Sequence, residues 1–244
     1  VQTCALPIYM ETFCVNLNIH YTIPQELWVK VKEIFTQMPG WTGFENGCPK
    51  WYGDGGKIIE GSLEPSGLQL YAEMPQSEWD TWLQLFKDKV TVVLGYPIGE
   101  PEDGYTFPYW LYRLIMTDSE LSYDDYKEEF DIGVFETEKQ AIETAKYYLA
   151  NVQGFCDYPC TYRIEYKKIS DCIDHKPDTV WIIQGWNTND NLDEIDIIES
   201  SFFLTEDKAN QELEKMKMVN KRTEWAVSRW KIGELKWRDG FIRV

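Results

Sequence analysis

Apolar residues along the N-terminal half of the chain alternate in some segments and recur at helical spacing in others. An alternating segment predicts a half-buried strand, and a stripe at every third or fourth position predicts a helix that packs on a core. The predicted elements, in chain order, are a strand over 12–19, a helix over 24–38, strands over 57–63 and 68–74, and a helix over 77–94. This β-α-β-β-α order predicts a two-layer sandwich domain over 10–105, in which helices cover one face of a small sheet.

A stretch rich in glycine and aromatic residues, 40–56, separates the first predicted helix from the strand pair and is predicted to be a loop. Four of its aromatic residues fall outside any periodic element: Trp41, Phe44, Trp51 and Tyr52. Aromatic side chains in a loop often anchor an interface with a partner, and they equally close a long loop over a small core of its own. Both interpretations remain open on sequence grounds.

An internal repeat organises the C-terminal half. Residues 133–141 and 201–209 share Phe, Thr, Glu and Ala at matching positions, and in each copy the Thr is placed to cap a helix whose first turn is acidic. Alternating apolar segments lie before and after each copy. We therefore predict an α+β fold in which a β-β-α-β unit occurs twice, over 106–172 and over 178–244.

Two short motifs accompany the first copy of the repeat. One is Phe-x-Thr-Glu-x-x-Ala over Phe135–Ala141, and the other is Gly-Phe-x-Asp-Tyr-Pro over Gly154–Pro159. With these motifs the C-terminal half resembles small bacterial domains of unknown function, arranged here as a tandem pair. The second copy departs from the pattern, because it has Asn220–Thr223 in place of the second motif. The resemblance implies no particular activity.

The first residues of the chain, 1–9, do not fit this organisation. The first eight read VQTCALPI, which resembles the translation of a short-read sequencing adapter, and Met10 follows as an ordinary start. We expect 1–9 to be an assembly artefact and the native protein to begin at Met10. No secretion signal follows Met10. Without Cys4 the chain has five cysteines, and an odd number does not indicate a framework of disulfides. A cytoplasmic protein with free thiols is expected.

The chain carries a formal net charge of −17. Phosphate groups are bound through Lys and Arg, so this charge argues against direct binding of nucleic acid or of an anionic membrane surface. It favours either good solubility alone or the attraction of a basic macromolecular partner.

Acidic residues are concentrated in 118–131 and in 190–199, which occupy the same position in the two predicted units, between the first two strands. Two acidic loops at related positions would form a negative surface for a basic partner, although exposed loops are often charged for solubility alone. The candidate partner-binding residues are the four loop aromatics together with Asp118, Glu120, Asp124, Asp125, Glu128, Glu129, Asp190, Asp193, Glu194 and Asp196.

Few residue combinations in the sequence suit catalysis or metal binding. The chain contains two His, and neither stands in a known nucleophile pattern, so we predict no catalytic residues. Four zinc-type ligands at short paired spacings define one candidate structural zinc site: Cys156, Cys160, Cys172 and His175. The competing interpretation is that these cysteines are ordinary packed thiols and that the protein has no cofactor.

These observations lead to a hypothesis of function. We expect a non-catalytic acidic binding protein, of the immunity type or the anti-defence type, that inhibits a basic partner such as a nuclease or another nucleic-acid-handling enzyme. The first alternative is a small-molecule or metal-dependent enzyme with its site in the Gly40–Gly56 loop. The second is a structural module without a discrete partner.

Overall fold

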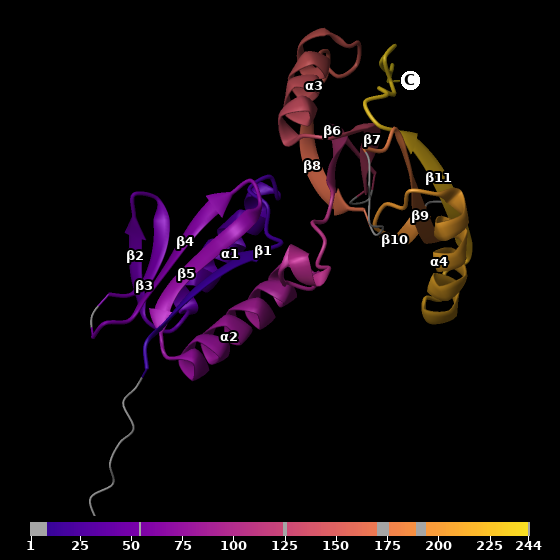
Figure 1. The fold of residues 1–244 in the computed structure, drawn as a ribbon. Helices are drawn as coiled ribbons and strands as arrows, with labels where there is room; N and C mark the ends of the chain where they lie inside the picture. Colours follow the sequence, from indigo (N-terminus) through magenta and orange to yellow (C-terminus); the bar gives the residue numbers. More distant parts are fainter. Residues whose placement is uncertain (1–8, 54, 124–125, 170–175, 189–193, 244) are drawn as a thin grey trace, which may run out of the picture. The chain divides into compact units, whose positions relative to one another are not determined.

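The computed structural model describes residues 9–53, 55–123, 126–169, 176–188 and 194–243. The chain divides into two compact units, Val1–Phe107 and Pro108–Val244. Within the described residues there are four α-helices and three antiparallel sheets, so the predicted α+β class is confirmed (Figure 1). Residues 1–8, which carry most of the adapter-like sequence, lie outside the described part of the chain.

The N-terminal unit is a five-stranded antiparallel sheet with two helices on one face (Figure 1). Its strand order is β1-β5-β4-β3-β2. Buried aliphatic residues on one face of the sheet meet the buried stripes of the helices, because side chains alternate along a strand and recur every third or fourth residue along a helix. The elements are β1 (Glu11–Leu17), α1 (Gln25–Gln37), β2 (Trp41–Glu45), β3 (Cys48–Tyr52), β4 (Ile58–Glu64), β5 (Gly67–Met74) and α2 (Gln76–Leu94).

The prediction of a loop over 40–56 was wrong, because much of that segment forms the β2–β3 hairpin. Asn46 and Gly47 form its turn, with φ of 51° and 84°. Positive φ at both positions is what a tight Asn-Gly hairpin turn requires. Gly43 and Pro49 interrupt the apolar alternation of these two strands, so periodicity alone did not identify them.

The C-terminal unit contains two three-stranded sheets and two helices. The strand orders are β7-β6-β8 and β10-β9-β11, so the first strand of each sheet lies in its centre. The elements are β6 (Trp110–Tyr123), β7 (Tyr126–Phe135), α3 (Glu138–Asn151), β8 (Cys160–Lys168), β9 (Thr179–Thr188), β10 (Glu194–Glu199), α4 (Glu206–Val219) and β11 (Glu224–Lys231).

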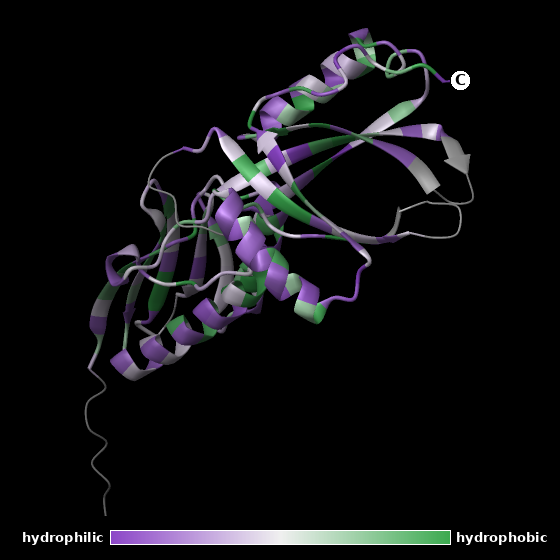
Figure 2. Cartoon of the chain, turned by 90° about the vertical axis from the view of Figure 1, so that its right-hand side faces the viewer, coloured by the Kyte–Doolittle hydropathy of each residue, from purple (hydrophilic) through white to green (hydrophobic). Residues whose placement is uncertain are grey.

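Each sheet of the C-terminal unit packs a helix on one face and the other sheet on the opposite face. Tyr112, Leu114 and Met116 of β6 share a core with α3, whereas Leu111 of β6 shares a second core with Val180, Ile182 and Trp230 of the other sheet. A third core, which includes Ile183, lies under α4. Hydrophobic and hydrophilic residues alternate along the helices and strands in Figure 2, as expected for elements with one buried face.

Residues 232–243, here called the C-terminal strap, leave β11 and return to the first sheet. The Gly233 N–H donates to the Val134 carbonyl at 2.8 Å, and the Lys236 N–H donates to the Ile132 carbonyl at 2.8 Å, so the strap pairs with the edge of β7. Phe241 stacks on Phe130 with ring centroids 4.6 Å apart. The strap therefore completes the core of the first sheet with residues from the far end of the sequence.

Candidate functional site

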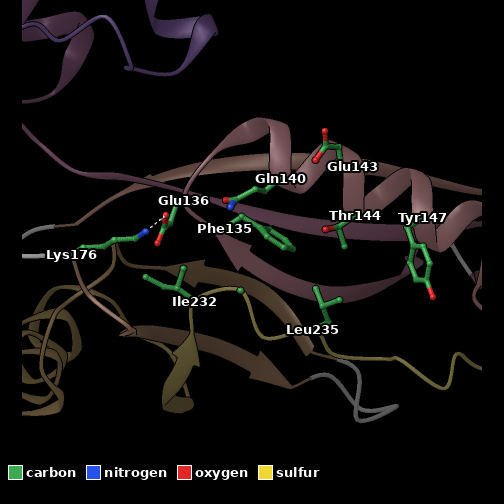
Figure 3. A pocket seen from close by; sticks show the side chains of 10 residues that line it. Phe135, Glu136, Gln140, Glu143, Thr144, Tyr147, Lys176, Ile232 and Leu235 are labelled. Carbon is green, nitrogen blue, oxygen red and sulfur yellow. Dashed lines mark ion pairs between the residues drawn. The ribbon is translucent and has the colours of Figure 1, made fainter. Parts of the chain in front are cut away.

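A groove of about 570 Å³ runs beside α3, between this helix and the C-terminal strap, and is open to solvent (Figure 3). It belongs entirely to the C-terminal unit. Three kinds of residue line it, namely a polar wall on α3, an apolar floor and an ion pair at one end. We regard this groove as the candidate functional site, because ligand sites are concave, with an apolar lining and a few placed polar groups.

The polar wall of the groove follows from the way α3 begins. Thr137 is the N-cap of α3: its hydroxyl accepts from the Gln140 N–H, and the Gln140 side chain accepts from the Thr137 N–H, both at 3.2 Å. This capping box fixes the first turn of the helix. Gln140, Glu143, Thr144 and Tyr147 then follow at intervals of three and four residues, so they share one face of α3 that borders the groove.

The floor of the groove is apolar and comes from two distant segments. Phe135 closes β7 and is buried, while Ile232 and Leu235 belong to the C-terminal strap and are half-buried. The hydrogen bond of Gly233 to β7 holds the two strap residues beneath the helix. Apolar surface that stays partly exposed in a concave site is available to a ligand with an apolar body.

An ion pair stands at one end of the groove. The Glu136 carboxylate lies 2.5 Å from the Lys176 ammonium, and the two side chains are 23% and 62% exposed respectively. The hydrogen bond to Glu136 raises the pKa of Lys176. At the opposite end, the Tyr147 ring is 57% exposed. The groove thus offers a partly buried carboxylate, an apolar floor and an aromatic ring, which suits a cationic group carried on an apolar stem.

The first acidic segment, 118–131, is largely strand rather than loop, and several of its carboxylates are paired within the protein. Asp118 is fully buried and receives a hydrogen bond from the Arg243 Nε at 2.8 Å, so its assignment to a partner-binding surface was wrong. Glu120 pairs with Arg243 at 2.9 Å, and Glu129 accepts from the Arg163 Nη2 at 2.7 Å. The Glu120 and Glu129 side chains are 61% and 44% exposed, so these two pairs lie on the surface.

The remaining candidate acids are only partly described. Glu128 is exposed on β7, and Asp124 and Asp125 lie outside the described residues, as do Asp190 and Asp193 of the second segment. That second segment is also largely strand where it is described, since Glu194 is the first residue of β10.

Asp196 is an exposed residue of β10. Its side chain accepts from the Asn187 side chain at 3.2 Å, and its carbonyl accepts from the Arg222 Nε at 2.7 Å. The candidate acids that the structure shows on the surface are therefore Glu120, Glu128, Glu129 and Asp196.

The four candidate aromatics form part of a core cluster rather than a free loop. Trp51 is fully buried and donates from its indole to the Phe35 carbonyl at 2.9 Å, so its assignment to a partner surface was wrong. Trp41 and Tyr52 are half-buried, and Phe44 is 50% exposed. Trp41 packs against both Phe44 and Trp51, with ring centroids 5.1 Å and 5.5 Å apart. Phe44 is thus the most accessible member of this group.

The zinc site and the enzyme site at 40–56 both stay predictions. Among the described residues no group of three or more His, Cys, Asp or Glu could hold a metal ion, while Cys172 and His175 of the proposed zinc set lie outside those residues. Cys156 is exposed and Cys160 is half-buried. An enzyme site at 40–56 would now involve the β2–β3 hairpin, beside which Tyr52, Glu78 and Trp82 help to line a pocket of about 250 Å³.

Sequence reasoning missed the groove, because its lining comes from α3, the strap and Lys176, which are far apart in the chain. The signal that was present is the polar stripe at helical spacing from Glu136 to Tyr147. Comparison of the chain with family models, with curated proteins and with solved structures finds no match. Within the described residues, no helix has both the length and the apolar character needed to cross a bilayer.

Proposed function

We propose that this protein is a non-catalytic binding protein that holds and inhibits a basic macromolecular partner. A protein of the immunity type, or an inhibitor of a nucleic-acid-handling defence enzyme, fits this description. The formal net charge of −17 supports the proposal, because opposite net charge steers association and raises its rate.

The observation that carries the proposal is the chemistry of the groove beside α3. Glu136 is a partly buried carboxylate whose cation, Lys176, is itself 62% exposed. An ion pair with one exposed member contributes little to stability, so a cation from another molecule can replace it at small cost. Next to Glu136, the apolar floor gives the stem of such a group a place to pack.

The internal pairing of the acidic segments refines the proposal. Asp118 is fully buried and is held by Arg243, so this carboxylate contributes to the shape of the unit and not to the capture of a partner. The excess negative charge of the chain attracts the partner at long range, and the groove supplies the short-range contacts.

We also propose that the two β-β-α-β arrangements are copies of one ancestral unit. Support comes from the shared Phe, Thr, Glu and Ala of 133–141 and 201–209 and from the central position of the first strand in each sheet. Both Thr137 and Thr205 accept a hydrogen bond at the start of their helices. The groove ion pair has no counterpart in the second copy, because Leu204 stands where Glu136 stands in the first.

A capture experiment tests the proposed function. The immobilised full-length protein is incubated with bacterial lysate at low salt and eluted with rising salt, beside a column that carries an unrelated protein of similar net charge. We expect a basic protein to be retained by this protein but not by the control, and to leave as salt screens the attraction. Equal retention on both columns, or retention that salt does not weaken, would contradict the proposal.

A further inference from the structure

We infer that the groove beside α3 receives an extended segment of the basic partner, in which an Arg or Lys side chain replaces Lys176 on Glu136 and a nearby apolar side chain lies on the groove floor. This inference rests on the proposed function, since it names the part of the partner that the groove contacts. It assigns to Lys176 the role of an internal stand-in for the partner's cation.

Glu136 is prepared to receive a cation before the partner arrives. It lies between the end of β7 and the N-cap Thr137, so the strand and the capping box fix its backbone on both sides. Its side chain is 23% exposed and therefore has little freedom to lose on binding. A carboxylate that is already ordered gains more from a new ion pair than one on a mobile side chain.

Lys176 is suited to leave Glu136. Its side chain is 62% exposed, and its ammonium can remain hydrated when it moves away from the carboxylate. The guanidinium of an arginine is more weakly hydrated than an ammonium and binds a carboxylate through two parallel hydrogen bonds. An incoming arginine therefore competes well for Glu136.

The dimensions of the groove set the spacing of the segment that fits it. From Gln140 to Tyr147 the helix rises by about 10 Å, at about 1.5 Å per residue. An extended chain covers that distance in about three residues, and side chains two positions apart point to the same side. A basic residue at position i and an apolar residue at position i+2 can therefore face Glu136 and the floor residues Ile232 and Leu235 from one side of the segment.

The shape of the groove favours a polypeptide over a free small molecule. Sites for small ligands enclose most of the ligand surface, whereas this groove is open along α3. One further carboxylate lines the groove, that of Glu143 on α3, and it is exposed. A basic segment that lies along an open groove brings its backbone and its flanking residues within reach of this carboxylate.

Short peptides test the inference directly. The probes are acetylated and amidated hexapeptides with Arg and Leu two positions apart, the same peptides with citrulline in place of Arg, and free N-acetylargininamide. Binding to the full-length protein is measured by calorimetry and by the shifts of backbone amide resonances. We expect the Arg peptide to shift the amides of α3 and the strap, and the citrulline peptide and N-acetylargininamide to bind at least about tenfold more weakly.

Variants at the two members of the ion pair should change affinity in opposite directions. Glu136→Gln removes the carboxylate that binds the arginine and should lower the affinity for the Arg peptide at least about tenfold. Lys176→Ala removes the competing cation and should strengthen binding about twofold to fivefold. Glu206→Gln, which makes the same charge change on α4, is the matched control and should leave affinity unchanged.

Three results would overturn the inference. They are equal binding of the Arg and citrulline peptides, equal effects of Glu136→Gln and Glu206→Gln, and binding of N-acetylargininamide as tight as that of the peptide. Lysate capture with Thr144→Arg separates this inference from the proposed function. The new arginine occupies the groove and carries the same positive charge as the partner's basic residue, so it should block the segment. If wild type and Thr144→Arg retain the same basic protein equally, the function stands and the groove is not its site. If wild type retains none, the proposed function fails.

Discussion

Arg243 of the C-terminal strap reaches back to Asp118 of β6, a fully buried carboxylate that accepts from the Arg243 Nε at 2.8 Å. The guanidinium also lies over the Tyr158 ring, 4.0 Å from its centroid. A single arginine therefore pairs with a buried carboxylate, packs on an aromatic ring and links the strap to the first sheet.

Replacing Arg243 should destabilise the C-terminal unit, because Asp118 would remain buried without its cation. We expect Arg243→Ala to lower the thermal midpoint by several degrees, whereas Arg238→Ala, at an exposed position of the same strap, should change it little. Differential scanning calorimetry on the two variants provides the measurement. Equal midpoints for both would show that the pair with Asp118 does not hold the strap in place.

A second arginine joins the two sheets of the C-terminal unit. Arg113 is 7% exposed and donates to Asp131 at 2.6 Å and 2.7 Å and to Glu199 at 2.7 Å. Arg113→Met keeps most of the volume but leaves two carboxylates without their main cation. We expect a loss of about 3–5 kcal/mol in the free energy of unfolding, measured by urea denaturation.

The double substitution Arg113→Met with Glu199→Gln serves as the control for that prediction. It removes one of the stranded charges, so it should recover part of the lost stability. If the double variant recovers no stability, the single variant loses its stability through poorer packing and not through an unpaired charge.

Glu199 should make stability depend on pH in the acid range. Burial alone would raise its pKa, but the charges and hydrogen bonds of Arg113 and Lys167 outweigh burial and lower the pKa to about 2. Because the pKa is lower in the folded state, the stabilisation is present above pH about 4.5 and is lost as the pH falls towards 2. A shift of this size corresponds to about 3 kcal/mol.

Urea denaturation between pH 6 and about pH 2.5 measures this dependence. In Glu199→Gln the slope of unfolding free energy against pH should be smaller than in wild type over that interval. An unchanged slope would assign the acid sensitivity to other carboxylates.

Substitutions in the aromatic cluster of the N-terminal unit should lower the free energy of unfolding more at a buried ring than at an exposed one. Trp51→Phe removes the indole N–H that satisfies the Phe35 carbonyl and leaves a cavity in a fully buried site, so we expect a loss of about 2–3 kcal/mol. Phe44→Ala changes a ring that is 50% exposed and should cost about 1 kcal/mol or less. Chemical denaturation of both variants tests the difference, and equal losses would contradict the assignment of Trp51 to the core.

Elements with a regular apolar pattern could be predicted from the sequence, whereas elements defined by distant partners could not. Helices α1 and α2 and strands β4 and β5 lie where periodicity predicted them. The β2–β3 hairpin was missed, although its Asn46–Gly47 turn is a strong local signal, because a stretch full of glycine and aromatic residues without regular alternation is typical of a loop.

The acidic segments show why charge is a poor guide to exposure. Glu129 and Arg163 are 34 residues apart, and Asp118 and Arg243 are 125 residues apart, so no local pattern reveals that these charges pair. The groove was hidden for the same reason, since Glu136 and Lys176 are 40 residues apart in the sequence.

The C-terminal strap also bears on how the protein is made. Phe241 stacks on Phe130, and Arg243 pairs with Asp118. The core of the first sheet therefore lacks these contacts until residues 232–243 have left the ribosome. Domains usually fold in the order of synthesis. In this unit the first sheet waits for a segment that is translated after both sheets, so a chain that stops before residue 232 exposes the aromatic core of the first sheet to chaperones and proteases.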